Sequence, residues 1–209
     1  MSDRIIVIGL CGRSGCGKGY VGSIFRNYGI FSVDTDKVYR ELLDEDGSEC
    51  LYELTDFFGE EILTREKKLD RRRLASIVFA KGNEDKLQKL NGITHKYILK
   101  KTKELISEYE SDGKRAIIID APVLFESGFD SLCDITLCVT APDTVLIKRI
   151  CERDGRTEEE ARLRLASQKS EDELRRRCSD VIVNDGVRDT AVQVADFIDK
   201  YKLGENYEI

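Results

Sequence analysis

Five short apolar runs recur along the chain, and none shows the strict alternation of a half-exposed strand. They read RIIVIG (4–9), IFSVD (30–34), AIIID (116–120), ITLCV (135–139) and DVIVN (180–184). Their β-branched residues favour strands, and their unbroken apolar character is typical of strands buried on both faces. Because patterns of helical period separate the runs, we predict an α/β fold with a five-stranded parallel sheet flanked by helices.

About eighty residues with a mostly helical pattern lie between the second and third runs. LDRRRLASIVFA has Asp70 as a possible N-cap, and the long amphipathic stretch that begins at NEDKLQKL is interrupted by Gly92. Such an insert is too long for a crossover loop, so we expect it to form a cap of helices. The expected parts of this single domain are a core (1–36, 116–147 and 179–209), a helical insert (37–115), a charged helical segment (148–178) and, within the core, a closing helix near 189–203.

Composition narrows the class of protein. The 209 residues are 41% hydrophobic and 35% charged, as in soluble globular proteins, and the net charge of −6 argues against a general nucleic-acid binder. No apolar segment approaches the roughly 18 residues of a membrane helix, and the first apolar run is too short for the core of a signal peptide. We therefore expect a cytoplasmic monomer that binds neither membranes nor nucleic acid.

The seven cysteines form no C-x-x-C pair. Cys133 and Cys138 come nearest to a metal-binding spacing, but no histidine or second cysteine pair accompanies them. We interpret the cysteines as reduced thiols that serve as small apolar residues.

The first apolar run leads directly into GRSGCGKGY (12–20), which matches the phosphate-binding motif G-x-x-x-x-G-K-S/T except at its last position. A strand before the glycines and an amphipathic helix after them form the context that this motif requires. Glycines let successive N–H groups converge on phosphate oxygens, and Lys18 adds a mobile positive charge. The motif predicts an ATP site and a P-loop NTPase fold, with these candidate ATP-binding residues: Gly12, Arg13, Ser14, Gly15, Cys16, Gly17, Lys18, Gly19 and Tyr20.

Gly19 replaces the serine or threonine whose hydroxyl usually binds Mg²⁺. Because Mg²⁺ keeps several waters and takes ligands from substrate phosphates, a water can fill this position, with Ser14 or an acidic residue steadying the ion. We therefore expect weaker metal binding, and a loss of activity does not follow.

Three carboxylates end predicted strands. Asp34 ends the second run and Asp36 lies two residues later, and Asp120 ends the third run, in the position of an acid that holds a water of Mg²⁺. Of the first pair, one is expected to cap the next helix and the other to accept a proton from an attacking hydroxyl; we assign the cap to Asp34 and the base to Asp36. Pro122 to Gly128 then form a partly apolar loop.

With these motifs in order, the sequence resembles the dephospho-coenzyme A kinase family of P-loop kinases. The resemblance covers nearly the whole chain and rests on GLCGRSGCGKG, VDTDKVYREL, LDRRRLASIVF, DAPVLFESG, KRICERDGRTEEEARLRLASQ and VIVNDG. It implies transfer of the γ-phosphate of ATP, with Mg²⁺, to the ribose 3′-hydroxyl of dephospho-coenzyme A, the last step of coenzyme A biosynthesis. It also implies that Asp36 is the base, that Lys18 binds phosphates, that 37–115 binds the acceptor and that 148–178 is a lid. The acceptor-binding candidates are Asp34, His95, Leu124, Phe125 and Glu126.

The chain departs from the family pattern at two positions. Gly19 stands where the family has serine or threonine, and His95-Lys96 stands where it has His-Pro. His95 is the only histidine. Two roles stay open for it: a structural or exposed residue, or a contact with the substrate. Lys96 removes a rigid proline, so the local shape of the cap is expected to differ.

Ten basic residues crowd into the predicted lid of this acidic chain: Lys148, Arg149, Arg153, Arg156, Arg162, Arg164, Lys169, Arg175, Arg176 and Arg177. Several are expected only to form ion pairs on a solvated helix face. Arg149 is our first candidate for contact with the transferring phosphate, followed by Arg153 and Arg164. Asn184, at the end of the last run, is either an adenine contact or a turn residue, and Gln168 has no assignable chemistry.

Three other functions stay open. Another nucleotide or small-molecule kinase would share the scaffold, since the fold does not fix the acceptor. A nucleotide-binding regulator with weak catalysis would explain Gly19, although the retained Lys18, the carboxylates and the arginines speak against it. Nucleic-acid binding is the weakest alternative, because the positive charge is confined to one segment.

Overall fold

The computed structural model describes residues 4–204, so the outermost residues of the predicted core, 1–3 and 205–209, lie outside the described part. Two compact units are present: residues up to Val33 together with those from Ile106 onward form the first, and Asp34–Leu105 forms the second. The elements of the first unit are β1 (Ile6–Cys11), α1 (Lys18–Arg26), β2 (Phe31–Asp34), β3 (Ala116–Asp120), η2 (Phe129–Leu132), β4 (Ile135–Thr140), α6 (Asp143–Asp154), α7 (Glu158–Ala166), α8 (Glu171–Arg177), β5 (Asp180–Val183) and α9 (Thr190–Tyr201).

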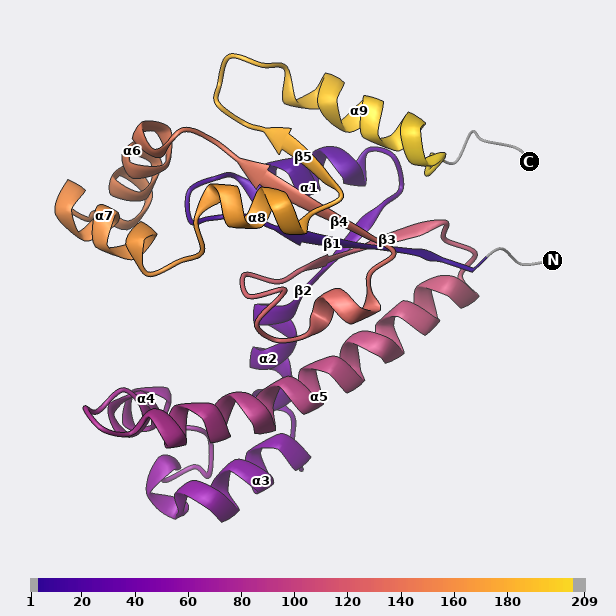
Figure 1. Cartoon of the computed structure of the whole chain (residues 1–209). Coiled ribbons are helices and arrows are strands. Elements are labelled where there is room, and N and C mark those ends of the chain that lie inside the picture. Colours follow the sequence, from indigo (N-terminus) through magenta and orange to yellow (C-terminus); the bar gives the residue numbers. More distant parts are fainter. Residues whose placement is uncertain (1–3, 205–209) are drawn as a thin grey trace. The chain divides into compact units, whose positions relative to one another are not determined.

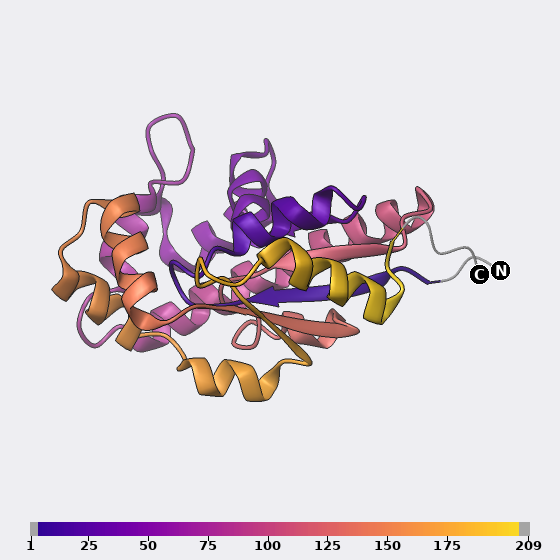
Figure 2. The ribbon, with the colours of Figure 1, turned by 90° about the horizontal axis from the view of Figure 1, so that it is seen from above.

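The five strands form one sheet in the order β2-β3-β1-β4-β5. β1 pairs in parallel with β3 and β4, and β4 pairs in parallel with β5, which confirms the predicted fold class. Every residue of β1 except Ile6 is buried, and β3 is buried as far as its last residue, Asp120. Helix α8 covers one face of the sheet, and α1 and α9 pack together on the other (Figures 1 and 2). Burial on both faces explains the unbroken apolar runs of the central strands β3, β1 and β4, whereas the edge strands β2 and β5 are only partly buried.

The second unit is helical. It contains α2 (Thr35–Asp44), α3 (Glu49–Phe58), η1 (Glu60–Ile62), α4 (Arg71–Val78) and most of α5 (Glu84–Ser111). Its core includes Leu54, Phe58, Ile62 and Ile93, which pack together with almost no exposed surface. Helix α5 continues through Gly92 without a break, so the interruption expected there is absent.

The predicted N-caps are confirmed. The Asp70 carboxylate accepts a hydrogen bond from the backbone N–H of Arg73, at the start of α4. Asp34 caps α2 by accepting hydrogen bonds from the N–H groups of Asp36 and Lys37, at 2.9 and 3.1 Å. Each cap satisfies donors that the first turn of a helix cannot pair internally.

No helix between residues 4 and 204 combines the length and the apolar character that a membrane span requires.

Candidate phosphate-binding site

The glycine loop joins β1 to the N-terminus of α1. Gly12, Gly15 and Gly17 have φ angles of +152°, +82° and +89°, which residues with a side chain rarely adopt. Gly17 is the N-cap residue of α1 and, having no side chain, forms no side-chain cap. The first N–H groups of α1 therefore remain available to an anion, and the partial positive charge of the helix end lies behind them.

The side chain of Asn184 is hydrogen-bonded to this loop. Its side chain is 7% exposed, and its Nδ2 donates a hydrogen bond of 2.8 Å to the carbonyl oxygen of Cys16. A Cβ atom on Gly17 would lie 2.2 Å from the same Nδ2, so both the φ angle and the contact require glycine. The Oδ1 of Asn184 accepts a hydrogen bond from Thr190. Through these two hydrogen bonds the Asn184 amide fixes the loop, and its contact with adenine stays a prediction.

Arg149 extends from α6 to the same place. Its Nη1 donates to the carbonyl oxygen of Gly15 at 3.3 Å and to that of Asn184 at 2.9 Å. Within residues 4–204 it forms no ion pair with a carboxylate, whereas the neighbouring Lys148 pairs with Glu152 at 3.9 Å. Arg149 therefore brings a positive charge that no acidic side chain offsets to the loop.

The two other candidate arginines share one carboxylate. Arg153 lies 2.7 Å from Asp154 and Arg164 lies 2.9 Å from it, and the hydrogen bond from Arg153 is the largest of the effects that lower the pKa of Asp154. Arg153 also reaches the loop, because its Nη2 donates to the Ser14 hydroxyl at 3.4 Å. Arg164 has no such contact, so Arg153 is the better placed of the two.

Two side chains, Gln168 and Arg13, connect the loop to α6 and to the helical segment 148–178. Gln168 accepts a hydrogen bond of 2.9 Å from the backbone N–H of Ser14. Arg13 pairs with Asp143 at 2.6 Å and donates to the carbonyl oxygen of Leu165. The sequence motif placed Arg13 among ATP-binding residues, but its guanidinium is directed to these protein partners. The sequence assigns no chemistry to Gln168, and its contact with the loop is visible only in the structure.

Lys18 begins α1 and folds back over the loop, where its Nζ donates to the carbonyl oxygen of Gly12 at 3.3 Å. Asp120 ends β3, paired in register with Leu10 near the end of β1. Both charges act on buried Cys16: burial is the main cause that raises the pKa of this thiol, Asp120 raises it further and Lys18 lowers it. Tyr20, also in the motif, is 56% exposed.

The apolar loop after β3 divides into a core residue and surface residues. Leu124 is 1% exposed and lies against Gly9, so its side chain belongs to the core and is not available to an acceptor. Phe125 is half-buried under the guanidinium of Arg177, 3.9 Å from the ring centroid. Glu126 pairs with Lys169 at 3.5 Å. Residues of 148–178 thus hold the exposed part of this loop.

The remaining candidates belong to the helical unit. The Asp36 carboxylate is exposed in the first turn of α2. His95 is half-buried on α5, and burial lowers the pKa of its imidazole. Lys96 pairs with Glu53 of α3 at 2.5 Å, an ion pair that a proline could not form.

Comparison with known proteins identifies the family of this chain. Residues 6–189 match the model of the dephospho-CoA kinase family. The dephospho-CoA kinase of Corynebacterium diphtheriae is 36% identical over 90% of this chain and 93% of its own. That of Carboxydothermus hydrogenoformans is 35% identical over 94% of each. The structure of dephospho-CoA kinase from Campylobacter jejuni superposes with a TM-score of 0.67 and 28% identity, covering 94% of this chain and 98% of that one. With the motif order, the parallel sheet and these matches in agreement, this chain belongs to the dephospho-CoA kinase family.

Proposed function

We propose that the chain performs the reaction of its family at the glycine loop, transferring the γ-phosphate of ATP to the ribose 3′-hydroxyl of dephospho-coenzyme A. The observation that carries the proposal is the uncapped N-terminus of α1, which is held open by Asn184 and flanked by Lys18 and Arg149. Backbone donors and two cations at one point suit a polyphosphate carrying several negative charges. Such local positive charge is needed on a chain whose net charge is −6.

The proposed roles follow from charge and reach. Lys18 and Arg149 neutralise the phosphates as negative charge moves during transfer, and Arg153 assists from the Ser14 side. Asp36 accepts the proton of the attacking hydroxyl, which leaves Asp34 as the helix cap beside it. The acceptor-binding roles of Asp34, His95, Phe125 and Glu126 stay predictions for each residue by itself. We omit Leu124 because its side chain is buried.

A magnesium site is part of this proposal. The candidate hard ligand is the Asp120 carboxylate, which ends β3 opposite Leu10 of β1, while Gly19 has no side chain and the Ser14 hydroxyl accepts a hydrogen bond from Arg153. These residues fit an ion that Asp120 holds through water and that takes its other ligands from phosphates and solvent. When bound, Mg²⁺ neutralises and orients the β- and γ-phosphates.

Replacing Gly19 with serine tests the metal site. An added Cβ would meet nothing within 4 Å, so serine fits without displacing a neighbour. The new hydroxyl is expected to lower the half-saturating Mg²⁺ concentration by roughly two- to tenfold, equivalent to one polar contact of about 0.5–1.5 kcal/mol. A Mg²⁺ titration of ATP turnover measures this, with Gly19→Ala as the control that adds a Cβ without an oxygen. The same Mg²⁺ dependence in both variants would refute the assignment.

Replacing Arg149 with alanine is expected to lower kcat by about 10²-fold, because one preorganised donor and its charge leave the transferring phosphate. Steady-state kinetics on the variant measure the change, and Arg149→Lys separates the charge from the loop contacts by keeping only the charge. Arg162→Ala serves as the control, since Arg162 is exposed and pairs with Glu158 at 3.6 Å. An unchanged kcat in Arg149→Ala would remove this residue from the site.

His95 provides a pH test, because it is the only histidine and gives a single set of imidazole resonances. Burial disfavours the charged ring, so its NMR titration midpoint is expected below the ordinary pKa of about 6.5. The unfolded chain then binds this proton at higher pH than the folded chain does. The contribution of His95 to stability is therefore complete above the unfolded pKa and declines as pH falls through the folded one. A midpoint at or above 6.5 would contradict the buried position.

The decisive experiment measures ADP release from ATP and Mg²⁺ with dephospho-coenzyme A, AMP, UMP or no acceptor. We expect turnover with dephospho-coenzyme A alone. Turnover with a different acceptor would replace the proposed substrate and keep the kinase chemistry. If calorimetry shows ATP binding but no acceptor gives turnover, the protein would be a regulator. Gly19→Ser, which restores the usual hydroxyl at this position, would then be the first variant to assay.

We also propose that the protein acts in the cytoplasm, which is supported by its seven free thiols.

A further inference from the structure

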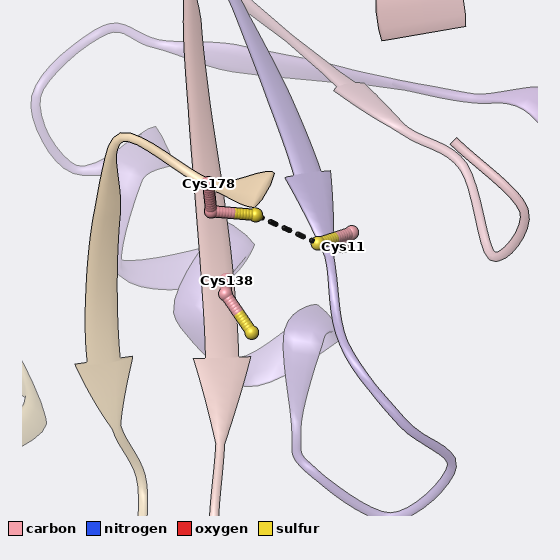
Figure 3. Close-up of side chains that lie close together, drawn as sticks. All are labelled: Cys11, Cys138 and Cys178. Carbon is pink, nitrogen blue, oxygen red and sulfur yellow. Dashed lines mark hydrogen bonds between the residues drawn. The ribbon is translucent and has the colours of Figure 1, made fainter. Parts of the chain in front are cut away.

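Three cysteines far apart in the sequence meet directly behind the glycine loop (Figure 3). Cys11 ends β1, immediately before Gly12, and pairs in register with Cys138 of β4, so the two side chains share one face of the sheet. Cys178 lies between α8 and β5. It is kept there by its neighbour Ser179, whose N–H donates to the carbonyl oxygen of Thr136 at 2.9 Å. The structure therefore builds this cluster from three separate backbone segments.

The sulfur atoms point toward one another. All three lie within 4.8 Å of each other, and those of Cys11 and Cys178 are 3.3 Å apart. Three thiolates at the usual metal–sulfur distance of about 2.3 Å around one ion are separated by about 3.8–4.0 Å. The cluster is therefore close to the size of a three-sulfur metal site, and small side-chain shifts suffice to reach it.

The surroundings suit a soft ion. Cys11 is 2% exposed and Cys138 is 1% exposed, while Cys178 is half-buried and gives access from the outside. Among residues 4–204, no histidine, aspartate or glutamate joins the three sulfurs as a further ligand. A ligand set made only of thiolates selects thiophilic ions over hard cations such as Mg²⁺. Three thiolate ligands suit a trigonal Cu⁺, or a tetrahedral Zn²⁺ that adds one water.

We propose that Cys11, Cys138 and Cys178 bind one thiophilic d¹⁰ metal ion, Cu⁺ or Zn²⁺, behind the glycine loop. Each thiol that coordinates gives its proton to solvent, so binding strengthens as pH rises. The bound ion ties the end of β1, and with it the start of the loop, to the segment between α8 and β5. This site is separate from the proposed magnesium site, which consists of oxygen ligands.

The test is metal binding by the full, reduced chain, and its readout does not depend on kinase activity. Zn²⁺ is titrated against a chromogenic chelator, and Cu⁺ is titrated without oxygen against a Cu⁺-specific one. We expect one ion per chain with a dissociation constant below about 1 µM for at least one of the two metals. Co²⁺ in place of Zn²⁺ adds a spectroscopic signature, since sulfur-to-cobalt charge transfer appears only if thiolates are ligands.

Two ligand variants and one matched control make the result specific. Cys178→Ser and Cys138→Ser should each weaken metal binding by at least about 10- to 100-fold. Losses of this size are typical even for residues that only hydrogen-bond to a metal ligand. Cys151→Ser should bind as the parent does, because this half-buried cysteine lies outside the cluster on α6. Circular dichroism establishes that each variant is folded. Binding weaker than 10 µM for both metals, or equal loss in the Cys151 control, would overturn the proposal. A third result would also overturn it: the reduced chain takes up no metal, and mild peroxide then removes exactly two thiols per chain. That result would indicate a disulfide pair instead of a metal site.

Discussion

Asp36→Asn is expected to lower kcat by about 10²–10⁴-fold, while KM for dephospho-coenzyme A changes little. The amide keeps the size and the hydrogen-bonding reach of the carboxylate but cannot accept the proton of the attacking hydroxyl. Because Asp34 supplies the cap of α2, the exchange at Asp36 leaves the start of the helix intact. Initial rates over a range of acceptor concentrations separate kcat from KM.

The control for this prediction is Glu41→Gln, which removes an exposed carboxylate from the same helix and disturbs only a pair with Lys37 at 3.5 Å. Its kcat should equal that of the parent. If Asp36→Asn loses less than about threefold in kcat, Asp36 is not the general base, since proton transfer by a positioned side chain contributes far more. Melting temperatures of both variants show whether any loss reflects folding instead.

Much of the first unit could be predicted because its signals are local. A strand buried on both faces needs an unbroken apolar run. The runs that contain β3 and β4 are such runs, and each can be recognised from the few residues of the strand itself. The caps at Asp34 and Asp70 could be predicted for the same reason, since an N-cap bonds to N–H groups two or three residues later. The break expected at Gly92 was wrong. The low helix propensity of one exposed glycine costs too little to interrupt a 28-residue helix.

The partners of the loop could not be predicted, because they are distant in sequence. Asn184 reaches Cys16 across 168 residues, and Gln168 reaches Ser14 across 154. A side-chain amide carries no periodic pattern, so nothing local distinguishes a loop clamp from a turn residue. Leu124 shows the opposite error: an apolar side chain on a loop suggested a ligand contact, yet it fills the space beside Gly9.

The cysteine cluster escaped the sequence for a related reason. Metal-binding motifs are recognised by short spacings within one segment, and here Cys11 and Cys178 are 167 residues apart. Cys133, which has the more suggestive spacing to Cys138, donates to the carbonyl oxygen of Phe129 and stays outside the cluster. Register between β1 and β4 brings Cys11 to Cys138, and register follows only once the strand order is known.

Lys18→Met should lower kcat by about 10²–10³-fold and raise KM for ATP, because the methionine fills the same space without the charge that meets the phosphates. The present hydrogen bond from Nζ to Gly12 is a weak one of 3.3 Å, so the ammonium group can leave it for a stronger, charged partner when ATP binds. Both effects are expected together, since this charge acts on the phosphates before and during transfer. In Asp36→Asn, by contrast, only kcat should fall.

Lys148→Met is the matched control for Lys18→Met. Lys148 is exposed on α6, and its pair with Glu152 at 3.9 Å contributes little in solvent. Steady-state kinetics of both variants should show the loss in Lys18→Met alone, and calorimetry should show weaker ATP binding by that variant. Equal kinetics in the two variants would mean that the glycine loop binds phosphate through its backbone only. The positive charge for phosphate transfer would then have to come from Arg149 or Arg153. The kcat of Arg149→Ala would show which of these two arginines supplies it.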